Sequence, residues 1–252
     1  MNRWQGQVAV VTGASAGIGA SIAEKLVKEG LKVVGIARRK ERVEELGSKL
    51  ANEPGKLYAV RADLTKKEDI LEAFEWIENN VGPVSILINN AGIGRKTNLI
   101  DGNIEDWSLV LDTNVLGLAI ASRQAIQSMR KHAVDGHIVN INSTAGYYVP
   151  SVPHINVYPA SKFAVTGMTQ TLRKELIALG SKIKVSSVSP GFVETEIFQA
   201  GGYTQDEEMN KLLGTLPSLK AEDVANAVLY VLGTPPNVQV TDLLVTPLGE
   251  FV

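Results

Sequence analysis

The stretch VVTGASAGIGASIAEKLVKEG, residues 10–30, decides the fold, because it joins an apolar β-like run to a helical pattern through three glycines. Gly13, Gly17 and Gly19 are spaced Gly-x-x-x-Gly-x-Gly, unlike the commoner Gly-x-Gly-x-x-Gly arrangement. Glycines at such a turn let the backbone turn tightly and approach a pyrophosphate, which then rests on the helix N-terminus. The stretch therefore predicts a dinucleotide phosphate site. A glycine-rich turn without a ligand is the alternative.

The same alternation of strand and helix continues along the chain. Short runs typical of β-strands occupy residues 7–13, 32–37, 56–62, 84–90, 137–143, 184–190 and 238–245. Helical patterns occupy residues 18–29, 41–50, 67–79, 104–131, 159–179 and 221–232. Strands separated by helices predict a parallel sheet covered on both faces. We expect one α/β domain over residues 1–252, a doubly wound sheet of about seven strands, with a small substrate-binding insertion around 192–216. Within this insertion, residues 198–214 are glycine-marked, polar and expected to be irregular.

Composition excludes several classes of function. The 252 residues are 44% hydrophobic and 21% charged, and a formal net charge of -2 gives no basic footprint for nucleic acid. With no cysteine, disulfides and thiolate chemistry are excluded, and the scattered His132, His137 and His154 predict no metal site. Since no signal peptide and no apolar stretch of spanning length is found, we expect a cytoplasmic protein without integral membrane segments.

The end of the second expected strand bears on cofactor choice. It reads GIARRKER, residues 35–42, in which Arg38 and Arg39 precede the first acidic residue, Glu41. An acid at this place favours NAD by holding the ribose 2′-hydroxyl, whereas a guanidinium matches the oxygens of a 2′-phosphate. We therefore expect NADP (NADPH), with NAD as the weaker alternative. Two solvated arginines at a helix start are the other interpretation.

The segment VYPASK, residues 157–162, places Tyr158 and Lys162 four positions apart, and Pro159 directly after the tyrosine suits a helix start. Residues at this spacing share one helix face. A positive charge about 5 Å from a phenol, at an effective dielectric of about 20, favours the phenolate by roughly 3 kcal/mol, about two pKa units. The pair thus predicts a proton-transferring tyrosine, although the motif alone also arises by chance.

Taken in order, these motifs resemble the short-chain dehydrogenase/reductase superfamily, single-domain type, over essentially the whole chain. The elements that carry the resemblance are TGASAGIG (12–19), NNAG (89–92), DTNVLG (112–117), Ser143, Tyr158 with Lys162, and PGFVET (190–195). The resemblance implies a single-domain Rossmann fold that binds NAD(P). By resemblance, the catalytic residues are Asn114, Ser143, Tyr158 and Lys162.

The roles of these residues follow from the same resemblance. Tyr158 exchanges a proton with the substrate oxygen, to which the Ser143 hydroxyl donates a hydrogen bond. Lys162 also holds the nicotinamide ribose, and Asn114 supports a water-linked proton path to Lys162. The alternatives are a helix-interior asparagine bonded to backbone for Asn114 and a turn-capping hydroxyl for Ser143.

The cofactor-binding residues also carry over by resemblance. They are Gly13, Ser15, Ala16, Gly17, Ile18, Gly19, Arg38, Arg39, Asp63, Leu64, Asn90, Ala91, Gly92, Tyr158, Lys162, Pro190, Gly191, Val193 and Thr195. Asp63 and Leu64 bracket the adenine in this interpretation, and Asp63 as a helix cap is the rival one.

The loop between Ser143 and Tyr158, TAGYYVPSVPHINV, is apolar and aromatic, and it is longer than in the family's commonest members. Such a loop over the reactive centre favours a hydrophobic alcohol or ketone. Candidate substrate contacts are Ala145, Tyr148, Val149, His154, Phe192 and Phe198. His154 either orients a substrate oxygen or shapes the loop, and the two phenylalanines either form the opposite wall or pack in the core.

Four further segments are similar to a subgroup of the superfamily, the farnesol dehydrogenase-like and keto- and hydroxysteroid reductase-like proteins. They are RWQGQVAVVTGAS (3–15), GLKVVGIARR (30–39), DGHIVNINS (135–143) and LKAEDVANAVLYVLGTP (219–235). The resemblance implies an NADP(H)-dependent oxidoreductase that interconverts a hydrophobic alcohol and its aldehyde or ketone, such as the terpenol farnesol. Keto- or hydroxysteroid reduction and broad-specificity carbonyl reduction are the alternatives.

A non-enzymatic nucleotide-binding regulator is the alternative from another class. It would be expected to lack Ser143, Tyr158 or Lys162, and all three are present. The family also implies a homodimer or homotetramer formed through the helices at 104–131 and 159–179. The outer residues of these helices are not apolar enough to predict association independently.

Overall fold

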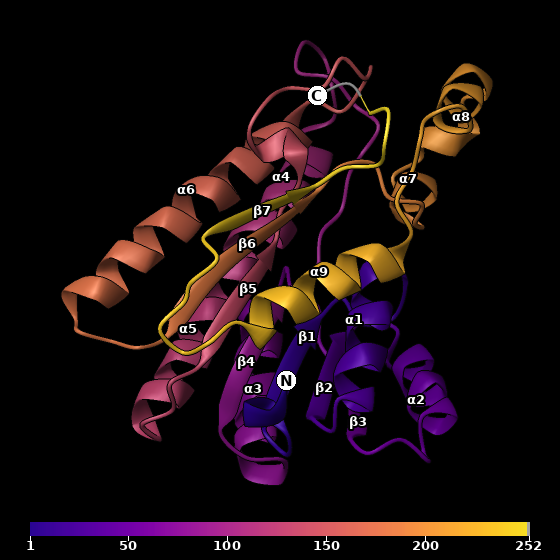
Figure 1. The fold of residues 1–252 in the computed structure, drawn as a ribbon. Coiled ribbons are helices and arrows are strands. Elements are labelled where there is room, and N and C mark those ends of the chain that lie inside the picture. Colours follow the sequence, from indigo (N-terminus) through magenta and orange to yellow (C-terminus); the bar gives the residue numbers. More distant parts are fainter. Residues whose placement is uncertain (251–252) are drawn as a thin grey trace.

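The computed structural model describes residues 1–250, and a single sheet of seven parallel strands runs through it (Figure 1). The spatial order is β3-β2-β1-β4-β5-β6-β7, and every neighbouring pair is parallel. The strands are β1 (Val8–Thr12), β2 (Lys32–Ala37), β3 (Lys56–Arg61), β4 (Val84–Asn89), β5 (His137–Ile141), β6 (Lys184–Pro190) and β7 (Asp242–Val245). The predicted doubly wound α/β fold is confirmed.

Helices follow the strands as the periodicity predicts. They are α1 (Gly17–Lys28), α2 (Lys40–Lys49), α3 (Lys67–Asn80), α4 (Ile104–Leu111), α5 (Leu118–Lys131), α6 (Val157–Ala178), α7 (Ile197–Ala200), α8 (Glu207–Leu213) and α9 (Ala221–Gly233). Shorter turns are η1 (Asn2–Trp4), η2 (Asp112–Gly117), η3 (Thr144–Gly146) and η4 (Tyr203–Gln205). Within residues 1–250, no helix combines the length and the apolar character that crossing a membrane requires.

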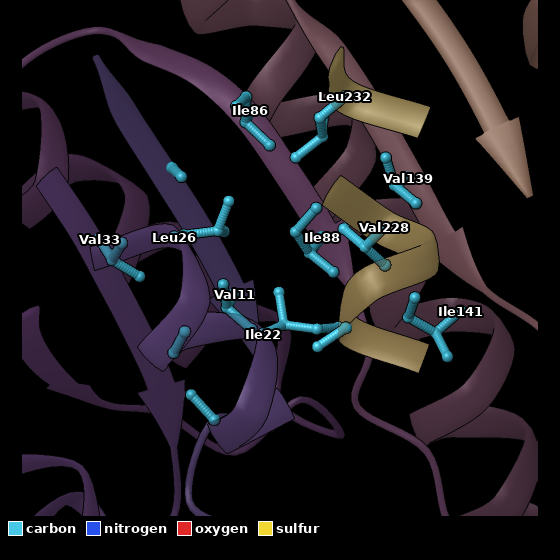
Figure 2. Packing of buried hydrophobic residues seen from close by; sticks show 14 of the residues in the cluster. Val11, Ile22, Leu26, Val33, Ile86, Ile88, Val139, Ile141, Val228 and Leu232 are labelled. Carbon is cyan, nitrogen blue, oxygen red and sulfur yellow. The ribbon is translucent and has the colours of Figure 1, made fainter. Parts of the chain in front are cut away.

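Two hydrophobic clusters, one on each face of the sheet, hold the layers together. Because side chains alternate along a strand, Ala9 and Val11 of β1 enter one cluster with α1, α2 and α9. Val8 and Val10 enter the other with α3, α5 and α6. Figure 2 shows the first cluster, in which side chains from α1 and α9 meet those of the central strands. Burial on both faces explains why the central strands β1 and β4 are buried at every residue and are nearly continuous apolar runs rather than alternating ones.

The strand order reverses between β1 and β4, and this reversal places the site. The chain winds outward from β1 to β2 and β3, then crosses back to β4 on the other side of β1. The connections that leave the carboxyl ends of β1 and β4 diverge, which opens a crevice where parallel α/β sheets bind ligands. The glycine turn after β1 and the NNAG segment at the end of β4 both lie there.

The structure divides the single helix predicted over 104–131. Its middle, η2, is a π-helical turn between α4 and α5. A π-turn inserts an extra residue and changes the direction of the side chains around it. Here Asn114 bonds to another segment, and Gly117 packs so closely that a Cβ would lie 2.5 Å from the Leu64 carbonyl oxygen. These two contacts account for the departure from a regular helix.

Two further boundaries differ from expectation. The last strand is confined to Asp242–Val245, because side chains rather than a ladder bind the segment before it. The Val238 carbonyl accepts from Lys184 Nζ at 2.7 Å, and the Val240 carbonyl accepts from Ser186 Oγ. The polar insertion around 192–216 is not irregular throughout: it contains α7, η4 and α8, which stand beyond the carboxyl ends of the strands (Figure 1).

His137, at the start of β5, is fully buried. Its Nε2 atom lies 2.9 Å from Ser186 Oγ on β6. Burial lowers the pKa of this imidazole to about 3, and the positive charges of Lys184 and Arg3 act in the same direction. The folded protein therefore holds His137 neutral in mild acid, where the unfolded chain binds a proton.

His137 is thus expected to lower stability in acid. Between an ordinary histidine pKa of 6.5 and the folded value of about 3, only the unfolded state gains this proton. The free energy of unfolding should then lose about 1.4 kcal/mol per pH unit from this group as pH falls. Urea unfolding of His137→Gln at a series of pH values should show a slope smaller by that amount. His154→Gln, which removes an exposed imidazole, should keep the full slope, and an equal slope in His137→Gln would contradict the assignment.

Candidate active site

The turn after β1 is shaped so that only glycine fits at two of its positions. Gly13 has a φ of 69°, and a Cβ there would lie 2.9 Å from Ala91 Cα. A Cβ on Gly19 would lie 2.4 Å from both Asn90 Nδ2 and the Gly13 carbonyl oxygen. No side chain caps the start of α1, whose N-cap is Ala16. The turn thus presents backbone amides and the positive end of a helix dipole, the arrangement that binds a pyrophosphate.

Hydrogen bonds tie this turn to the end of β4. Thr12 Oγ1 accepts from the backbone amides of Asn90 and Ala91, each at 3.1 Å. In return, Asn90 Nδ2 donates to the carbonyl oxygens of Thr12 at 3.0 Å and Gly13 at 3.3 Å. The two sides of the strand-order reversal are therefore held in a fixed relation at the level of the crevice.

A cavity of about 370 Å³ lies over this turn. The predicted cofactor residues that line it are Gly13, the 15–18 segment, Arg38, Arg39, Asp63, Leu64, the 90–92 segment and Thr195. Gly19 lies behind the turn, where its lack of a side chain admits Asn90. Asp63 lines the cavity. The rival interpretation of Asp63 as a helix cap is wrong: its carboxylate accepts from the backbone amide and hydroxyl of Thr65 in a turn, whereas α3 begins at Lys67 with Lys66 as its N-cap.

A second cavity, of about 840 Å³, adjoins the first. Both cavities are lined by Ile18, Asn90, Gly92, Gly94, Thr195 and Ile197, so they are continuous. Tyr158, Lys162 and Ser143 lie in the wall of the larger one, together with Pro190, Gly191 and Val193 from the end of β6 and the segment after it. The predicted catalytic group and the predicted phosphate site are therefore two parts of one cleft.

Lys162 is buried, with 5% of its surface exposed, and its Nζ donates to the Ile141 carbonyl at 3.0 Å. The same atom lies 5.7 Å from the centre of the Tyr158 ring, since both residues project from the first turns of α6. Burial lowers the pKa of Lys162 to about 8. The predicted shared helix face is thus observed.

The expected lowering of the Tyr158 pKa is not observed. Burial raises the pKa of this phenol above its usual value, and the neighbouring Ser143 side chain acts in the opposite direction. The expectation was wrong because it counted the lysine charge and left out the cost of removing a phenolate from water. At neutral pH the protein alone therefore holds Tyr158 protonated, ready to donate.

Asn114 and Ser143 both make the local contacts of their structural alternatives. Asn114 Oδ1 accepts from the amide of Ile93 at 2.8 Å, and its Nδ2 donates to the Ile93 carbonyl at 2.9 Å and to Ser161 Oγ at 3.0 Å. Asn114 is buried behind both cavities and fixes the segment that lines them. Ser143 Oγ accepts from the amide of Ala145 at 3.1 Å while it lines the larger cavity.

Comparisons with known proteins agree on the family. A family model described as short chain dehydrogenase matches residues 7–206. Farnesol dehydrogenase of Aedes aegypti is 51% identical over 252 residues, covering 99% of this chain and 99% of that protein. Dehydrogenase/reductase SDR family member 11 of Bos taurus is 46% identical over 253 residues, covering 98% of each. The chain belongs to the short-chain dehydrogenase/reductase family.

A solved structure supports the same conclusion. The closed form of serine dehydrogenase complexed with NADP+ matches with a TM-score of 0.88 at 31% identity, covering 98% of this chain and 97% of that chain. The family assignment makes the protein an oxidoreductase that uses a nicotinamide cofactor. The glycine turn and the uncapped start of α1 fit the pyrophosphate of such a cofactor. The predicted resemblance to the family and to the farnesol dehydrogenase-like subgroup is confirmed.

The candidate substrate residues divide into two groups. Ala145, Tyr148, Val149, Phe192 and Phe198 line the larger cavity. His154 is exposed outside the lining; its carbonyl accepts from the Thr97 amide at 3.2 Å, and its φ is 62°. Its contacts match the loop-shaping interpretation.

Sequence reasoning did not find three residues of this dehydrogenase cleft. Tyr203 lies edge-on to Phe198, with ring centres 5.7 Å apart, and its hydroxyl donates to the Arg95 carbonyl. Glu250 accepts from the Phe192 amide, with distances of 3.1 and 3.3 Å to its two oxygens. Glu196, at the cofactor end, lies between two arginines. Only Tyr203 could have been found from the sequence, as an aromatic residue in the insertion. Glu196 and Glu250 could not, because their partners lie far away in the chain.

The close approach at Gly13 is testable against a matched glycine. Gly180 has a similar φ of 64°, but no atom lies within 4 Å of a Cβ built there. Alanine at either position should cost about 1–2 kcal/mol of unfolding free energy for the left-handed backbone. Gly13→Ala must also displace Ala91, so urea unfolding should show a larger loss than in Gly180→Ala. Calorimetric titration with 2′,5′-ADP should show binding weakened only in Gly13→Ala. Equal losses with unchanged binding would contradict a turn packed for the nucleotide.

Proposed function

We propose that this protein is an NADP(H)-dependent oxidoreductase that interconverts a hydrophobic alcohol and its aldehyde or ketone, a terpenol such as farnesol being the favoured substrate. The observation that carries the proposal is the cavity of about 840 Å³, in which Tyr158, Lys162 and Ser143 supply polar groups and much of the rest of the wall is apolar. A concave apolar site with a few converging polar groups suits a lipophilic molecule with one reacting oxygen.

Side chains from two separate segments support the lipophilic assignment. Tyr148, Val149 and Val152 line the cavity from the long loop before α6, and Phe192 and Phe198 line it from beyond β6. The two phenylalanine rings are 5.1 Å apart between centres. An extended isoprenoid chain would lie along such walls, with its oxygen at Ser143 and Tyr158.

The insertion at 192–216 acts, in this proposal, as the substrate-binding part of the domain. Its position is held by polar contacts with the loop that follows β4. Lys96 Nζ pairs with Asp206 at 2.7 Å, and Arg95 Nη1 donates to the Ala200 carbonyl at 2.8 Å. Since none of these four residues lines the larger cavity, the contacts position the wall and leave the interior of the cavity apolar.

The chain's own residues provide the proton chemistry of the proposed reaction. The bound cofactor supplies or accepts the hydride. Tyr158, held protonated by burial, donates its proton to the substrate oxygen during reduction, and the Ser143 hydroxyl donates a hydrogen bond to the same oxygen. Lys162 then stabilises the phenolate left behind, because its ammonium stays mostly charged at neutral pH with a pKa of about 8. Oxidation of an alcohol reverses these steps.

The preference for NADP rests on Arg38 and Arg39, which both line the smaller cavity at the end of β2. Arg39 Nη2 lies 3.5 Å from Ser15 Oγ of the glycine turn, so its guanidinium reaches toward the nucleotide side. A guanidinium at this point offers paired donors to a 2′-phosphate. NAD is the weaker alternative, since no acidic residue ends β2 to bind a free 2′-hydroxyl.

Keto- or hydroxysteroid reduction is the second candidate, because aromatic side chains in the wall and a volume of about 840 Å³ also suit a fused-ring substrate. We further propose a cytoplasmic protein that forms a homodimer or homotetramer. Large apolar side chains exposed around α4, η2 and α6 support association: Leu111 is 41%, Leu116 53% and Phe163 43% exposed.

The function is tested by following NADPH and NADH oxidation with farnesal, a keto-steroid and a polar sugar aldehyde. We expect NADPH to support faster turnover of farnesal than NADH does, and the sugar to be a poor substrate. Tyr158→Phe should lower kcat by at least about a hundredfold, the lower range of general acid catalysis. Binding of 2′,5′-ADP, which does not need the phenol, should stay unchanged in that variant.

The outcomes separate the parts of the proposal. Turnover of the keto-steroid but not of farnesal would select the second candidate. Turnover of the sugar alone would contradict the hydrophobic cavity as the substrate site. Near-normal kcat in Tyr158→Phe would remove Tyr158 as the proton donor.

A further inference from the structure

Glu196 closes an ion-pair bridge across the edge of the smaller cavity. One carboxylate oxygen lies 3.0 Å from Arg39 Nη2, and the two oxygens lie 2.9 and 3.2 Å from Arg42 Nη1. Glu196 immediately precedes α7, whereas Arg39 and Arg42 belong to the start of α2. The bridge therefore joins the insertion to the part of the cleft that follows β2.

The bridge lies where the proposed function needs a free guanidinium. Ser15, Arg39 and Glu196 all line the same cavity, and Arg39 is a residue assigned above to the 2′-phosphate. A phosphate monoester carries a charge of about -1.5 to -2 at neutral pH, so a carboxylate on the same guanidinium repels it. Glu196 is ionised well into acid, because hydrogen bonds from Arg39 and Arg42 lower its pKa.

Resting on the proposed function, we propose that Glu196 is a specificity-determining residue that competes with the cofactor's 2′-phosphate for Arg39. It thereby reduces the discrimination between nucleotides with and without that phosphate. A nucleotide lacking the 2′-phosphate does not need Arg39 and leaves the bridge intact.

The strength of the bridge decides the kind of effect to expect. All three side chains are almost half exposed, at 44%, 46% and 44% for Arg39, Glu196 and Arg42. Exposed ion pairs are weak, so the phosphate can displace the carboxylate, and the competition lowers affinity without blocking entry. Arg42 contacts both oxygens and can keep Glu196 when Arg39 turns to the phosphate.

The test measures dissociation constants of 2′,5′-ADP and 5′-AMP, which differ only by the 2′-phosphate, by calorimetry for the wild type, Glu196→Gln and Glu194→Gln. Glu196→Gln should bind 2′,5′-ADP roughly three- to fivefold more tightly, the upper scale of an exposed charge interaction, with 5′-AMP changed less than about twofold. Glu194→Gln is the matched control: it removes the same charge two residues earlier, from an exposed side chain that lines neither cavity. It should leave both constants within about twofold of the wild type.

Two results would overturn the inference. Glu196→Gln could leave the ratio of the two dissociation constants unchanged, or it could bind 2′,5′-ADP more weakly, which would make Glu196 a support for Arg39 instead of a competitor. Failure of the proposed cofactor preference would give a different result in the same experiment. It would show as equal affinity of the wild-type protein for the two nucleotides, whatever the substitution does to their ratio.

Discussion

The buried ammonium group of Lys162 is the constraint on which the rest of the cleft depends. A charged group inside a protein is tolerated only where polar partners replace water, and here the Ile141 carbonyl at the end of β5 accepts from Nζ. Gly92 lies next to the ammonium group, since a Cβ at that position would be in ordinary contact with Nζ at 3.7 Å and with Asn114 Oδ1 at 3.5 Å. The lysine is thus enclosed between the end of β5, the segment after β4 and η2.

The reversal of strand order explains why this lysine and the glycine turn share one cleft. β1 and β4 are neighbours in the sheet, and hydrogen bonds between Thr12 and the 90–91 segment hold their ends together. The turn after β1 forms the floor of the smaller cavity, and β4 continues into the segment that lines both cavities. In the proposed function, a nucleotide bound at the turn extends toward Tyr158 and Lys162, because the two cavities are continuous.

Local patterns predicted most of this arrangement. The apolar runs predicted all seven strands, and the four-residue spacing predicted that Tyr158 and Lys162 share a helix face. Regular periodicity did not reveal the π-turn at η2, because it arises from Asn114 binding Ile93, twenty-one residues away. Spacing also does not report burial, which is why the sequence predicted a lowered pKa for Tyr158 where the structure gives a raised one.

The long-range placement of single residues was harder to predict. His154 was considered for its chemistry, but the backbone of its loop places it outside the cavity. Glu196 and Glu250 were missed because their partners, Arg39 and the Phe192 amide, become neighbours only in the folded chain.

The central claim is that Lys162 titrates as a buried ammonium within reach of Tyr158. Its pKa can be measured directly by NMR on protein labelled with ¹³C at lysine Cε, with the Lys162 signal assigned by its loss in Lys162→Arg. The structure predicts two lysine signals with midpoints near pH 8, because burial lowers the pKa of both Lys162 and Lys184 to about 8 from the ordinary 10.5. The signal that is lost in Lys162→Arg is the one to be compared with this prediction. A Lys162 midpoint at the ordinary value would mean that the ammonium lies in water, and it would contradict the account.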